Sequence, residues 1–256
     1  MPIYSELKGK SAIITGGSAG IGAAICLALA DQGVNVLVNG KSHREAADKI
    51  AGAALQKGVK AVVELADVTR SAEVMRMLAS AEVAFGQVDV LINNVGGFPQ
   101  RRTVVETPEE EWDEIINLNL RSAFLCSKAV LPGMLERGWG RIINVSSEVA
   151  RTPVVFTAAH YAAGKAGLLG FTRHLAKEVA ARGITVNATC PSTTFSERIR
   201  RLYDTPERIA QLEALTPIGR VANPEDQAGL VVFLCSDAAS YITGATIDVS
   251  GGKVMM

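Results

Sequence analysis

The chain has few of the features that mark secreted, membrane-bound or nucleic-acid-binding proteins. Among its 256 residues, lysine plus arginine and aspartate plus glutamate each number 26, so the formal net charge is zero. A balanced charge argues against a nucleic-acid partner or a polybasic membrane anchor. No apolar run approaches the ~20 residues that span a bilayer, and the N-terminus lacks a basic-then-apolar signal pattern. We therefore expect a cytoplasmic protein that binds neither nucleic acid nor membrane.

Cysteine and aromatic residues are also scarce. The chain has 4 cysteines, far apart, at Cys26, Cys126, Cys190 and Cys235. Their spacing fits neither a zinc site nor a paired redox motif, so we expect small buried residues in a reducing compartment and no metal site. Aromatic residues make up 5% of the chain, whereas 48% of it is hydrophobic. That composition suits one sizeable buried core.

Short apolar runs alternate with helical patterns along the whole chain. Strands are expected at 10–15, 34–38, 61–65, 88–92, 140–147, 184–190 and 245–249. Helices are expected at 23–32, 44–56, 72–85, 107–130 and after 158, and another begins at 223–226. Apolar strands that alternate with helices are typical of a parallel sheet with right-handed crossovers. The sequence predicts an α/β fold, a single-domain doubly wound parallel sheet of the Rossmann type with helices on both faces, over residues 1–256.

The helix expected at 107–130 carries its own boundary signals. Thr107 is a candidate capping hydroxyl, with Pro108 in the first turn and Glu110 three residues on. Pro132 and Gly133 should interrupt the helix after residue 130.

A glycine-rich turn joins the first expected strand to the first expected helix. Gly16, Gly20 and Gly22 lie in the sequence Gly-Gly-Ser-Ala-Gly-Ile-Gly. The order of strand, glycine turn and helix start suits a phosphate group, because backbone N–H groups and the helix dipole point toward it. Glycine also allows the close approach of a pyrophosphate. We predict a dinucleotide-binding loop; the alternative is a turn without a ligand.

The residues after the second expected strand bear on which dinucleotide is bound. In dinucleotide-binding folds an acidic residue about 20 positions past the glycines binds the ribose hydroxyls. This chain has Gly40 there, followed by Lys41, Ser42 and Arg44, and we expect no carboxylate to compete for these residues. Two cations and a hydroxyl could hold a 2′-phosphate, or could form an ordinary solvated helix start. The sequence favours NADP(H) and leaves NAD(H) open.

A tyrosine and a lysine four residues apart suggest proton-transfer chemistry. Tyr161 and Lys165 lie in an expected helix, so both side chains share one face. A nearby cation favours the phenolate form of a tyrosine, which lets the phenol exchange protons near neutral pH. Ser147 supplies a hydroxyl at the end of the preceding apolar run. Taken alone, this spacing more often marks a half-buried tyrosine beside a solvated lysine.

Three helical glycines point to close packing. Gly164, Gly167 and Gly170 each weaken a helix by up to ~1 kcal/mol relative to alanine. We expect another helix to approach this face, within the chain or across a subunit interface. Asn119 lies in an apolar stripe, where an asparagine is more often a satisfied core residue than a catalyst.

Two further segments could shape substrate access. Residues 195–216 are polar and charged, and we expect them to form a mobile insert that acts as a substrate lid. Glu148 directly follows Ser147 and could meet a polar substrate group, although an exposed loop glutamate is the simpler expectation.

Together these motifs resemble the short-chain dehydrogenase/reductase family over essentially the whole chain. Residues 15–22 are similar to its cofactor loop, and 93–96 to its strand-4 motif, with Val95 where alanine is usual. Asp67 matches the acid near the adenine. The family's catalytic tetrad falls on Asn119, Ser147, Tyr161 and Lys165. Within the family the chain is most similar to 3-oxoacyl-acyl-carrier-protein reductases.

The resemblance implies hydride transfer between NAD(P)(H) and a carbonyl or secondary alcohol, with a 3-oxoacyl thioester as one candidate substrate. It implies that Tyr161 exchanges the proton, that Lys165 lowers the pKa of the phenol and holds the nicotinamide ribose, and that Ser147 binds the substrate oxygen. Asn119 would support a water in the proton relay, and the protein would be a homotetramer. The residues expected at the cofactor are Gly16, Ser18, Ala19, Gly20, Ile21, Gly22, Lys41, Ser42, Asp67, Val68, Asn94, Gly96, Tyr161, Lys165, Pro191 and Thr194.

The chain departs from the family pattern at a few positions. Gly164 stands where serine is common, Ser192 replaces the usual glycine after Pro191, and Ser250 stands where aspartate is commoner. The second departure leaves open whether Thr193, Thr194 or Ser196 contacts the cofactor.

Other functions remain as alternatives to this one. Within the family, the substrate could be a sugar, a steroid or another small alcohol, with NAD as cofactor. Outside that chemistry, the chain could be a non-catalytic nucleotide-binding sensor or a Rossmann-type methyl transferase. The natural substrate and the direction of reaction stay open.

Overall fold

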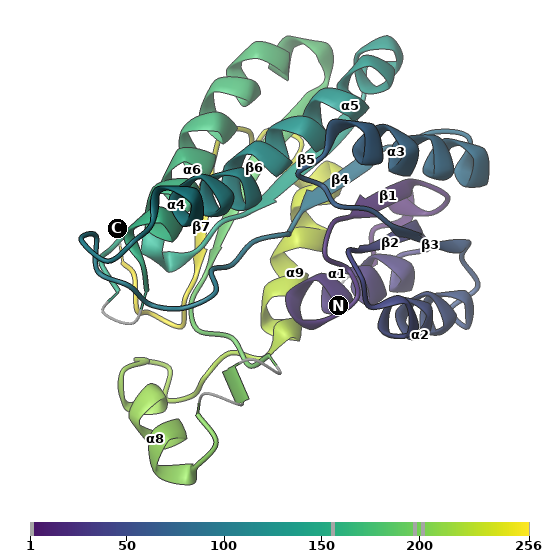
Figure 1. The fold of residues 1–256 in the computed structure, drawn as a ribbon. Helices are drawn as coiled ribbons and strands as arrows, with labels where there is room; N and C mark the ends of the chain where they lie inside the picture. Colours follow the sequence, from purple (N-terminus) through teal and green to yellow (C-terminus); the bar gives the residue numbers. More distant parts are fainter. Residues whose placement is uncertain (1–2, 155–156, 197–198, 201–202, 256) are drawn as a thin grey trace.

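The described residues, 3–154, 157–196, 199–200 and 203–255 of the computed structural model, form a seven-stranded parallel sheet with helices on both faces (Figure 1). The strands are β1 (Ser11–Ile14), β2 (Asn35–Gly40), β3 (Ala61–Leu65), β4 (Val90–Asn93), β5 (Gly140–Val145), β6 (Ile184–Pro191) and β7 (Thr246–Val249). Their order across the sheet is β3-β2-β1-β4-β5-β6-β7. The predicted doubly wound parallel sheet is confirmed.

The helices connect successive strands and cover the sheet. They are α1 (Gly20–Asp31), α2 (Arg44–Leu55), α3 (Ser71–Phe85), α4 (Glu109–Ile116), α5 (Ser122–Arg137), α6 (Ala159–Val179), α8 (Pro206–Ala214) and α9 (Pro224–Cys235). Figure 1 shows α8 standing away from the two helical layers. In the described part of the chain, no helix combines the length and apolar character that crossing a membrane requires.

The pleat of each strand divides the apolar side chains between two cores. In β1, Ile14 packs with residues of α1, α2 and α9, whereas the neighbouring Ile13 packs with residues of α3, α5 and α6. Successive strand residues point to opposite faces, so a fully buried strand must be apolar throughout. Each such side chain contributes roughly 1.5–3 kcal/mol through burial. The four cysteines are free and buried, as predicted.

The strand order places a topological switch point between β1 and β4, and sheets of this type form a crevice at such a point. β1 pairs with β2 on one side and with β4 on the other, so the chain winds in opposite directions from this point. In open parallel sheets, ligands bind at such a switch point, outside the carboxyl ends of the strands. The glycine turn after β1 and the residues after β4 meet there.

The start of α4 differs from the prediction. The helix begins at Glu109, and the preceding Pro108 is its N-cap residue, without a side-chain capping bond. The Thr107 hydroxyl donates instead to the carbonyl of Thr103, 2.8 Å away. The expected cap at Thr107 is therefore wrong, because its hydroxyl closes the turn before the helix.

The helical irregularity between α4 and α5 also lies at a different position from the predicted one. Pro132 lies inside α5, which continues to Arg137, so the predicted interruption there is wrong. Pro132 is on the exposed side of α5, where water can bond the carbonyl that its missing N–H leaves free. The irregularity is instead a π-helical turn, Asn117–Arg121, between α4 and α5. Such turns often lie at functional sites.

The glycines of α6 explain part of its packing. A Cβ on Gly164 would lie 3.0 Å from the Cβ of Asn119, and one on Gly167 would lie 2.9 Å from Leu120 Cδ2. The predicted close approach is confirmed at these two positions, within the chain. At Gly170 it is not, since an added Cβ meets nothing within 4 Å among the described residues.

Candidate functional site

The glycine turn after β1 is shaped for a ligand that approaches its backbone. A Cβ on Gly22 would lie 2.3 Å from the carbonyl oxygen of Gly16, so no larger residue fits. Gly16 and Gly20 have φ angles of +63° and +53°, which favour glycine. The N-cap residue of α1, Ala19, makes no side-chain capping bond. The first N–H groups of α1 therefore face the crevice without a side chain to cap them, as an anion site requires.

Asn94 and Thr15 tie this turn to the end of β4. The Asn94 side-chain amide donates to the carbonyls of Thr15 (3.0 Å) and Gly16 (3.2 Å). The Thr15 hydroxyl accepts from the backbone N–H groups of Asn94 (2.9 Å) and Val95 (3.1 Å). Asn94 thus fixes the shape of the turn. Thr15 was not among the predicted site residues; its only signal is a hydroxyl at the end of a buried strand.

Asn39, at the end of β2, holds the other side of the turn. Its side-chain oxygen accepts from Gly16 N (3.2 Å), and its backbone carbonyl accepts from Gly17 N (2.8 Å). Its amide nitrogen donates to the carbonyls of Gly40, Glu64 and Ala66, at 3.1–3.2 Å. Asn39 was also missed, although a buried polar residue at a strand end was visible in the sequence.

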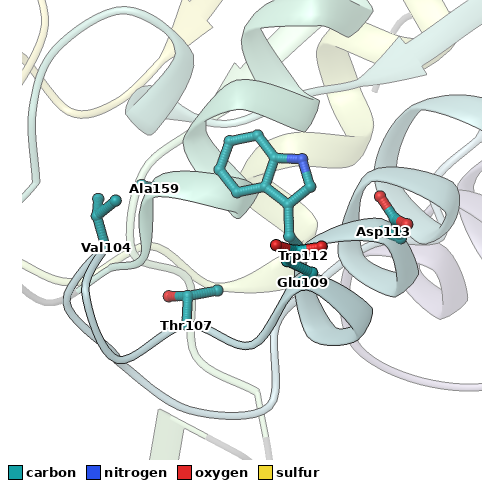
Figure 2. A pocket seen from close by; sticks show the side chains of 6 residues that line it. All are labelled: Val104, Thr107, Glu109, Trp112, Asp113 and Ala159. Carbon is teal, nitrogen blue, oxygen red and sulfur yellow. The ribbon is translucent and has the colours of Figure 1, made fainter.

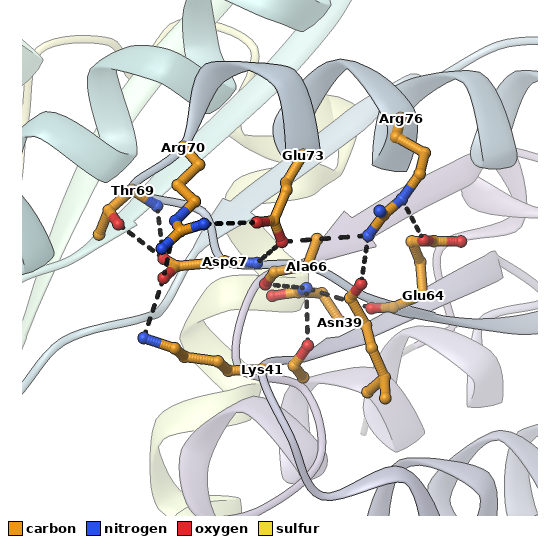
Figure 3. Close-up of polar contacts among 11 residues, drawn as sticks. Asn39, Lys41, Glu64, Ala66, Asp67, Thr69, Arg70, Glu73 and Arg76 are labelled. Atoms are coloured by element: carbon orange, nitrogen blue, oxygen red, sulfur yellow. Dashed lines mark hydrogen bonds and ion pairs between the residues drawn. The ribbon is translucent and has the colours of Figure 1, made fainter.

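The predicted phosphate-binding lysine has a carboxylate partner (Figure 3). Lys41 Nζ lies 2.9 Å from Asp67 Oδ2, although the two residues follow different strands. Thr69 donates to Asp67 Oδ1 through its N–H (3.0 Å) and its hydroxyl (2.6 Å). Partial burial raises the pKa of Asp67, but hydrogen bonds from Thr69 and Lys41 outweigh it and lower the pKa to about 2. The expectation that no carboxylate competes for Lys41 is wrong.

The neighbouring cations are also paired. Arg44 lies 2.9 Å from Asp48, one turn along α2. Arg70 Nε lies 3.9 Å from Asp67 Oδ2. Lys41 and Arg70 remain largely exposed, at 74% and 72% of their side-chain surfaces. A surface ion pair of this kind contributes little and can exchange partners when another anion arrives.

Lys165 occupies a buried position beside the end of β5. Its Nζ donates to the carbonyl of Val145 at 2.8 Å, and the residue is 2% exposed. The Ser146 hydroxyl donates to the backbone carbonyl of Lys165 at 2.9 Å, so β5 and α6 are joined twice here. Burial lowers the pKa of Lys165 to about 8. The solvated-lysine alternative does not describe this residue.

Asn119, from the π-helical turn, lies beside Lys165 and the Gly96–Gly97 backbone. Its side-chain oxygen accepts from Gly97 N (2.9 Å), and its amide donates to the carbonyls of Gly97 and Ile115 (both 2.8 Å). A Cβ on Gly96 would lie 2.5 Å from Lys165 Nζ and 2.7 Å from Asn119 Oδ1. The glycine lets all three residues meet at one point.

Tyr161 and Ser147 flank this cluster. Tyr161 lies one helical turn before Lys165, and its ring centroid is 4.9 Å from that of Phe98. Ser147 follows β5 and accepts from the backbone N–H of Val149 at 3.4 Å. A hydroxyl that accepts one bond keeps its hydrogen for another acceptor. The arrangement therefore offers two hydroxyl groups and a buried ammonium near the crevice.

The residue before Tyr161 belongs to a buried polar cluster that the sequence did not predict. His160 is completely buried, and its Nε2 lies 3.1 Å from Glu111 Oε1. Arg102 Nε donates to the other oxygen of Glu111 at 2.9 Å. Hydrogen bonds from His160 and Arg102 lower the pKa of Glu111. The cluster joins α4, the start of α6 and the segment after β4, which the sequence pattern around His160 did not indicate.

The end of β6 carries the last predicted cofactor residues. Pro191 closes the strand, and the Thr194 hydroxyl donates to the carbonyl of Ser192 at 2.9 Å. Glu148 is 5% exposed, and its Oε1 accepts from Thr193 N at 3.2 Å. The expectation of an exposed loop glutamate is therefore wrong. Val68 packs in the core beside α3, so its side chain does not face the crevice.

The remaining predicted cofactor residues surround the glycine turn and β2. Gly40 lies close to Ser18, since an added Cβ would be 3.5 Å from Ser18 Oγ. Ile21 is half-buried at the start of α1, and Ser42 is exposed after β2. The sheet thus brings the predicted residues to one edge, at the carboxyl ends of its strands.

A separate cavity lies where α4, the loop before it and the start of α6 meet (Figure 2). It has a volume of about 310 Å³ and is lined by side chains of the 104–113 region and by Ala159. None of the predicted site residues lines it, so we assign it no part in the site. Among the described residues, no group of three or more His, Cys, Asp or Glu is placed to hold a metal ion.

Comparison with known proteins places this geometry in context. A family model described as "Enoyl-(Acyl carrier protein) reductase" matches residues 16–253. The 3-oxoacyl-[acyl-carrier-protein] reductase FabG of Staphylococcus aureus (strain Mu50) is 40% identical over 246 residues, 96% of this chain and 98% of that protein. The FabG protein of Pseudomonas aeruginosa (strain PAO1) is 41% identical over 253 residues, covering 98% and 99%.

A solved structure is similar over nearly the whole fold. It is a 3-oxoacyl-[acyl-carrier protein] reductase with bound NAD from Brucella melitensis. It shares 30% identity and a TM-score of 0.89, over 97% of this chain and 92% of that one.

Proposed function

The chain belongs to the short-chain dehydrogenase/reductase family and is an NAD(P)-dependent oxidoreductase, and we propose that it reduces the 3-keto group of an acyl thioester. The observation that carries the proposal is the buried Lys165, which Val145 holds one turn from Tyr161 and which packs against Gly96. Relatives 40–41% identical that carry the name 3-oxoacyl-[acyl-carrier-protein] reductase support the substrate class.

The crevice fits a dinucleotide. Gly16, Gly20 and Gly22 leave room for a pyrophosphate, and the start of α1 would hold it through backbone N–H groups. Asp67 and the backbone of Val68 would lie at the adenine, while Pro191 and Thr194 would lie beside the nicotinamide. When bound, a reduced nicotinamide supplies the hydride that a carbonyl carbon accepts.

Three side chains then stabilise the charge that develops on the substrate oxygen and transfer a proton to it. As the carbonyl oxygen gains negative charge, the hydroxyl groups of Ser147 and Tyr161 donate hydrogen bonds to it. Tyr161 gives its proton to that oxygen, and the product is a secondary alcohol. The ammonium of Lys165 stabilises the phenolate that remains, because an opposite charge nearby favours the ionised form. In alcohol oxidation the same proton moves the other way.

Asn119 acts in this scheme by position. Its side chain is committed to Gly97 and Ile115, so it holds the segment after β4, which includes Gly96, against Lys165. Support of a water in a proton relay stays a prediction.

NADPH is the cofactor we propose, with Lys41 and Ser42 at the 2′-phosphate. Lys41 is 74% exposed and can turn from Asp67 to a phosphate at little cost. Arg70, within 3.9 Å of Asp67, would compensate that carboxylate when Lys41 leaves. NADH is the alternative if the Lys41–Asp67 pair persists.

Two further features concern how the substrate reaches the site and how the chains assemble. Within the segment at about 195–216, residues 197–198 and 201–202 lie outside the described part of the chain. The described remainder, which includes α8, would be part of a substrate lid, because α8 stands away from the helical layers (Figure 1). We propose a homotetramer in the cytoplasm, where four free, buried cysteines stay reduced.

The test is cofactor oxidation against a panel of substrates, with NADPH and NADH side by side. The panel holds a 3-oxoacyl thioester, an enoyl thioester, a ketosteroid, a sugar and a simple diketone, with Tyr161→Phe as the blank. The proposal expects NADPH-dependent turnover of the 3-oxoacyl thioester that is lost in the variant. Turnover of another substrate alone would replace the substrate class, and absence of cofactor binding would overturn the function.

A further inference from the structure

Glu148 directly follows the candidate catalytic serine and is buried. It opens a short 3-10 turn, Glu148–Ala150, in which its own carbonyl accepts from the N–H groups of Arg151 (2.9 Å) and Thr152 (3.0 Å). Its side chain is only 7% exposed. A buried carboxylate needs hydrogen bonds and a counter-charge, since an isolated one is costly in an apolar interior. Its partners therefore show what the side chain does.

Those partners come from two distant segments. Glu148 Oε1 accepts from the backbone N–H of Thr193 at 3.2 Å, and Lys253 Nζ lies 3.6 Å from the same oxygen. Lys253 Nζ also donates to the hydroxyl of Thr193 at 3.4 Å, and its side chain is 15% exposed. The three residues form a closed triangle. It joins the turn after Ser147 to the residues that follow β6.

Lys253 is held in place by its own segment, the C-terminal tail (residues 250–255). Gly251 has a φ of +61°, and its carbonyl accepts from Ile218 N at 3.0 Å. The Ser250 hydroxyl accepts from Val254 N at 3.2 Å and closes a turn around Lys253. The departure at Ser250 thus has a structural role. The tail thereby places the Lys253 ammonium beside Glu148.

The segment at 191–194 has open space on its other side. Ser192 and Gln227 line a cavity of about 190 Å³. Gln227 Nε2 reaches the hydroxyl of Thr194 at 3.4 Å, and Ser192 N donates to the carbonyl of Val249 at 3.3 Å. With a cavity behind it, this segment depends on polar contacts for its position. The Glu148–Lys253 pair supplies two of these contacts, both to Thr193, and Glu148 is the residue next to Ser147.

We propose that Glu148 is a positioning residue that, together with Lys253, sets the 191–194 segment relative to Ser147 and thereby controls cofactor affinity. The inference rests on the proposed function, in which 191–194 lies beside the nicotinamide. It assigns the C-terminal tail a part in cofactor binding, at a distance from the cofactor itself.

The test uses two single variants and their combination. Lys253→Met leaves the Glu148 carboxylate buried without a cation, and Glu148→Gln leaves the Lys253 ammonium without an anion. Each should raise the dissociation constant for NADPH about tenfold, whereas the double variant should return it to within about threefold of wild type. An uncharged pair of similar volume leaves no buried charge without its counter-charge, which is the defect that each single variant introduces. NADPH affinity is measured by fluorescence titration of the full chain.

Arg151→Met is the matched control. Arg151 and Asp248 form a neighbouring ion pair at 3.2 Å, 19% and 14% exposed, that joins the same region to β7, whereas the Glu148–Lys253 pair bonds to Thr193. This variant should lower the melting temperature and leave the NADPH dissociation constant unchanged. An equal loss of affinity in Arg151→Met would overturn the proposal, since general destabilisation would then explain it.

Hydrogen exchange of the Thr193 amide gives a readout without cofactor. Both single variants should speed its exchange in the free protein, and the double variant should slow it again. If the Thr193 amide exchanged at the wild-type rate in the single variants, the proposed contact with Glu148 would be overturned. If it exchanged faster while the NADPH affinity stayed unchanged, the proposed control of NADPH binding would be overturned. If the wild-type protein bound no nicotinamide cofactor, the proposed function itself would be refuted. The claim that Glu148 and Lys253 control NADPH affinity would then be refuted with it.

Discussion

Gly96→Ala tests whether the packing around Lys165 sets the geometry of the site. The added Cβ would lie 2.5 Å from Lys165 Nζ and 2.7 Å from Asn119 Oδ1, against ordinary contacts of 3.4–4 Å. Lys165 Nζ must therefore move by 3.4 minus 2.5, or about 0.9 Å, before the methyl group fits. Its 2.8 Å bond to the Val145 carbonyl cannot survive that shift in its present geometry.

The expected cost follows from that displacement. A misplacement of about 1 Å in a catalytic group can reduce a rate by roughly 100-fold. We expect kcat with NADPH and a 3-oxoacyl thioester to fall by about that factor in Gly96→Ala. A weakened hydrogen bond to a buried charged group should also lower the free energy of unfolding by about 1–3 kcal/mol. Steady-state kinetics and denaturant unfolding measure the two effects.

Gly170→Ala provides the control in the same helix as Lys165. An added Cβ there meets nothing within 4 Å among the described residues. Alanine should stabilise the helix by up to ~1 kcal/mol and leave kcat unchanged. The reasoning would be refuted if Gly96→Ala kept a kcat within about twofold of wild type, or if both alanine variants lost activity alike.

Three other variants probe separate parts of the site. Lys41→Asp should lower kcat/KM for NADPH and raise it for NADH, and an unchanged ratio of the two would contradict the 2′-phosphate assignment. Ser147→Ala should reduce kcat by orders of magnitude while the NADPH dissociation constant stays near wild type; a parallel loss of binding would make the serine structural. Burial lowers the pKa of Lys165 from 10.5 to about 8. Between those two pH values the lysine keeps its proton in the unfolded chain but has lost it in the folded protein, so the free energy of unfolding rises with pH. The free energy of unfolding, from denaturant titrations, should gain up to about 3 kcal/mol across that range, and Lys165→Met should lack this gain; identical pH profiles would show that the lysine is not desolvated.

Local sequence signals were sufficient for the sheet and for the glycine turn. Buried parallel strands are apolar on both faces, so β1 and β4 are visible as short apolar runs. The turn at Gly16–Gly22 is visible because its conformation restricts the residue type within seven consecutive positions. Tyr161 and Lys165 share a helix face for the same local reason.

Contacts between distant segments were not predictable in this way. Lys41 pairs with Asp67, 26 positions later, because β2 and β3 are neighbours in the sheet. Glu148 is buried because Lys253 reaches it from the other end of the chain. The π-helical turn at Asn119 likewise depends on α6 packing against it through Gly164, and no local pattern distinguishes it from a continuous helix.

Transfer of a labelled hydride tests the proposed chemistry most directly. The protein would be given a 3-oxoacyl thioester and NADPH that carries deuterium at the transferable position of the nicotinamide, and the product would be analysed by mass spectrometry and NMR. We predict a 3-hydroxyacyl thioester with deuterium on the carbinol carbon, and no such product with Tyr161→Phe. Deuterium on a chain carbon of a reduced enoyl thioester alone, or equal product from Tyr161→Phe, would contradict reduction of the keto group with Tyr161 as the proton donor.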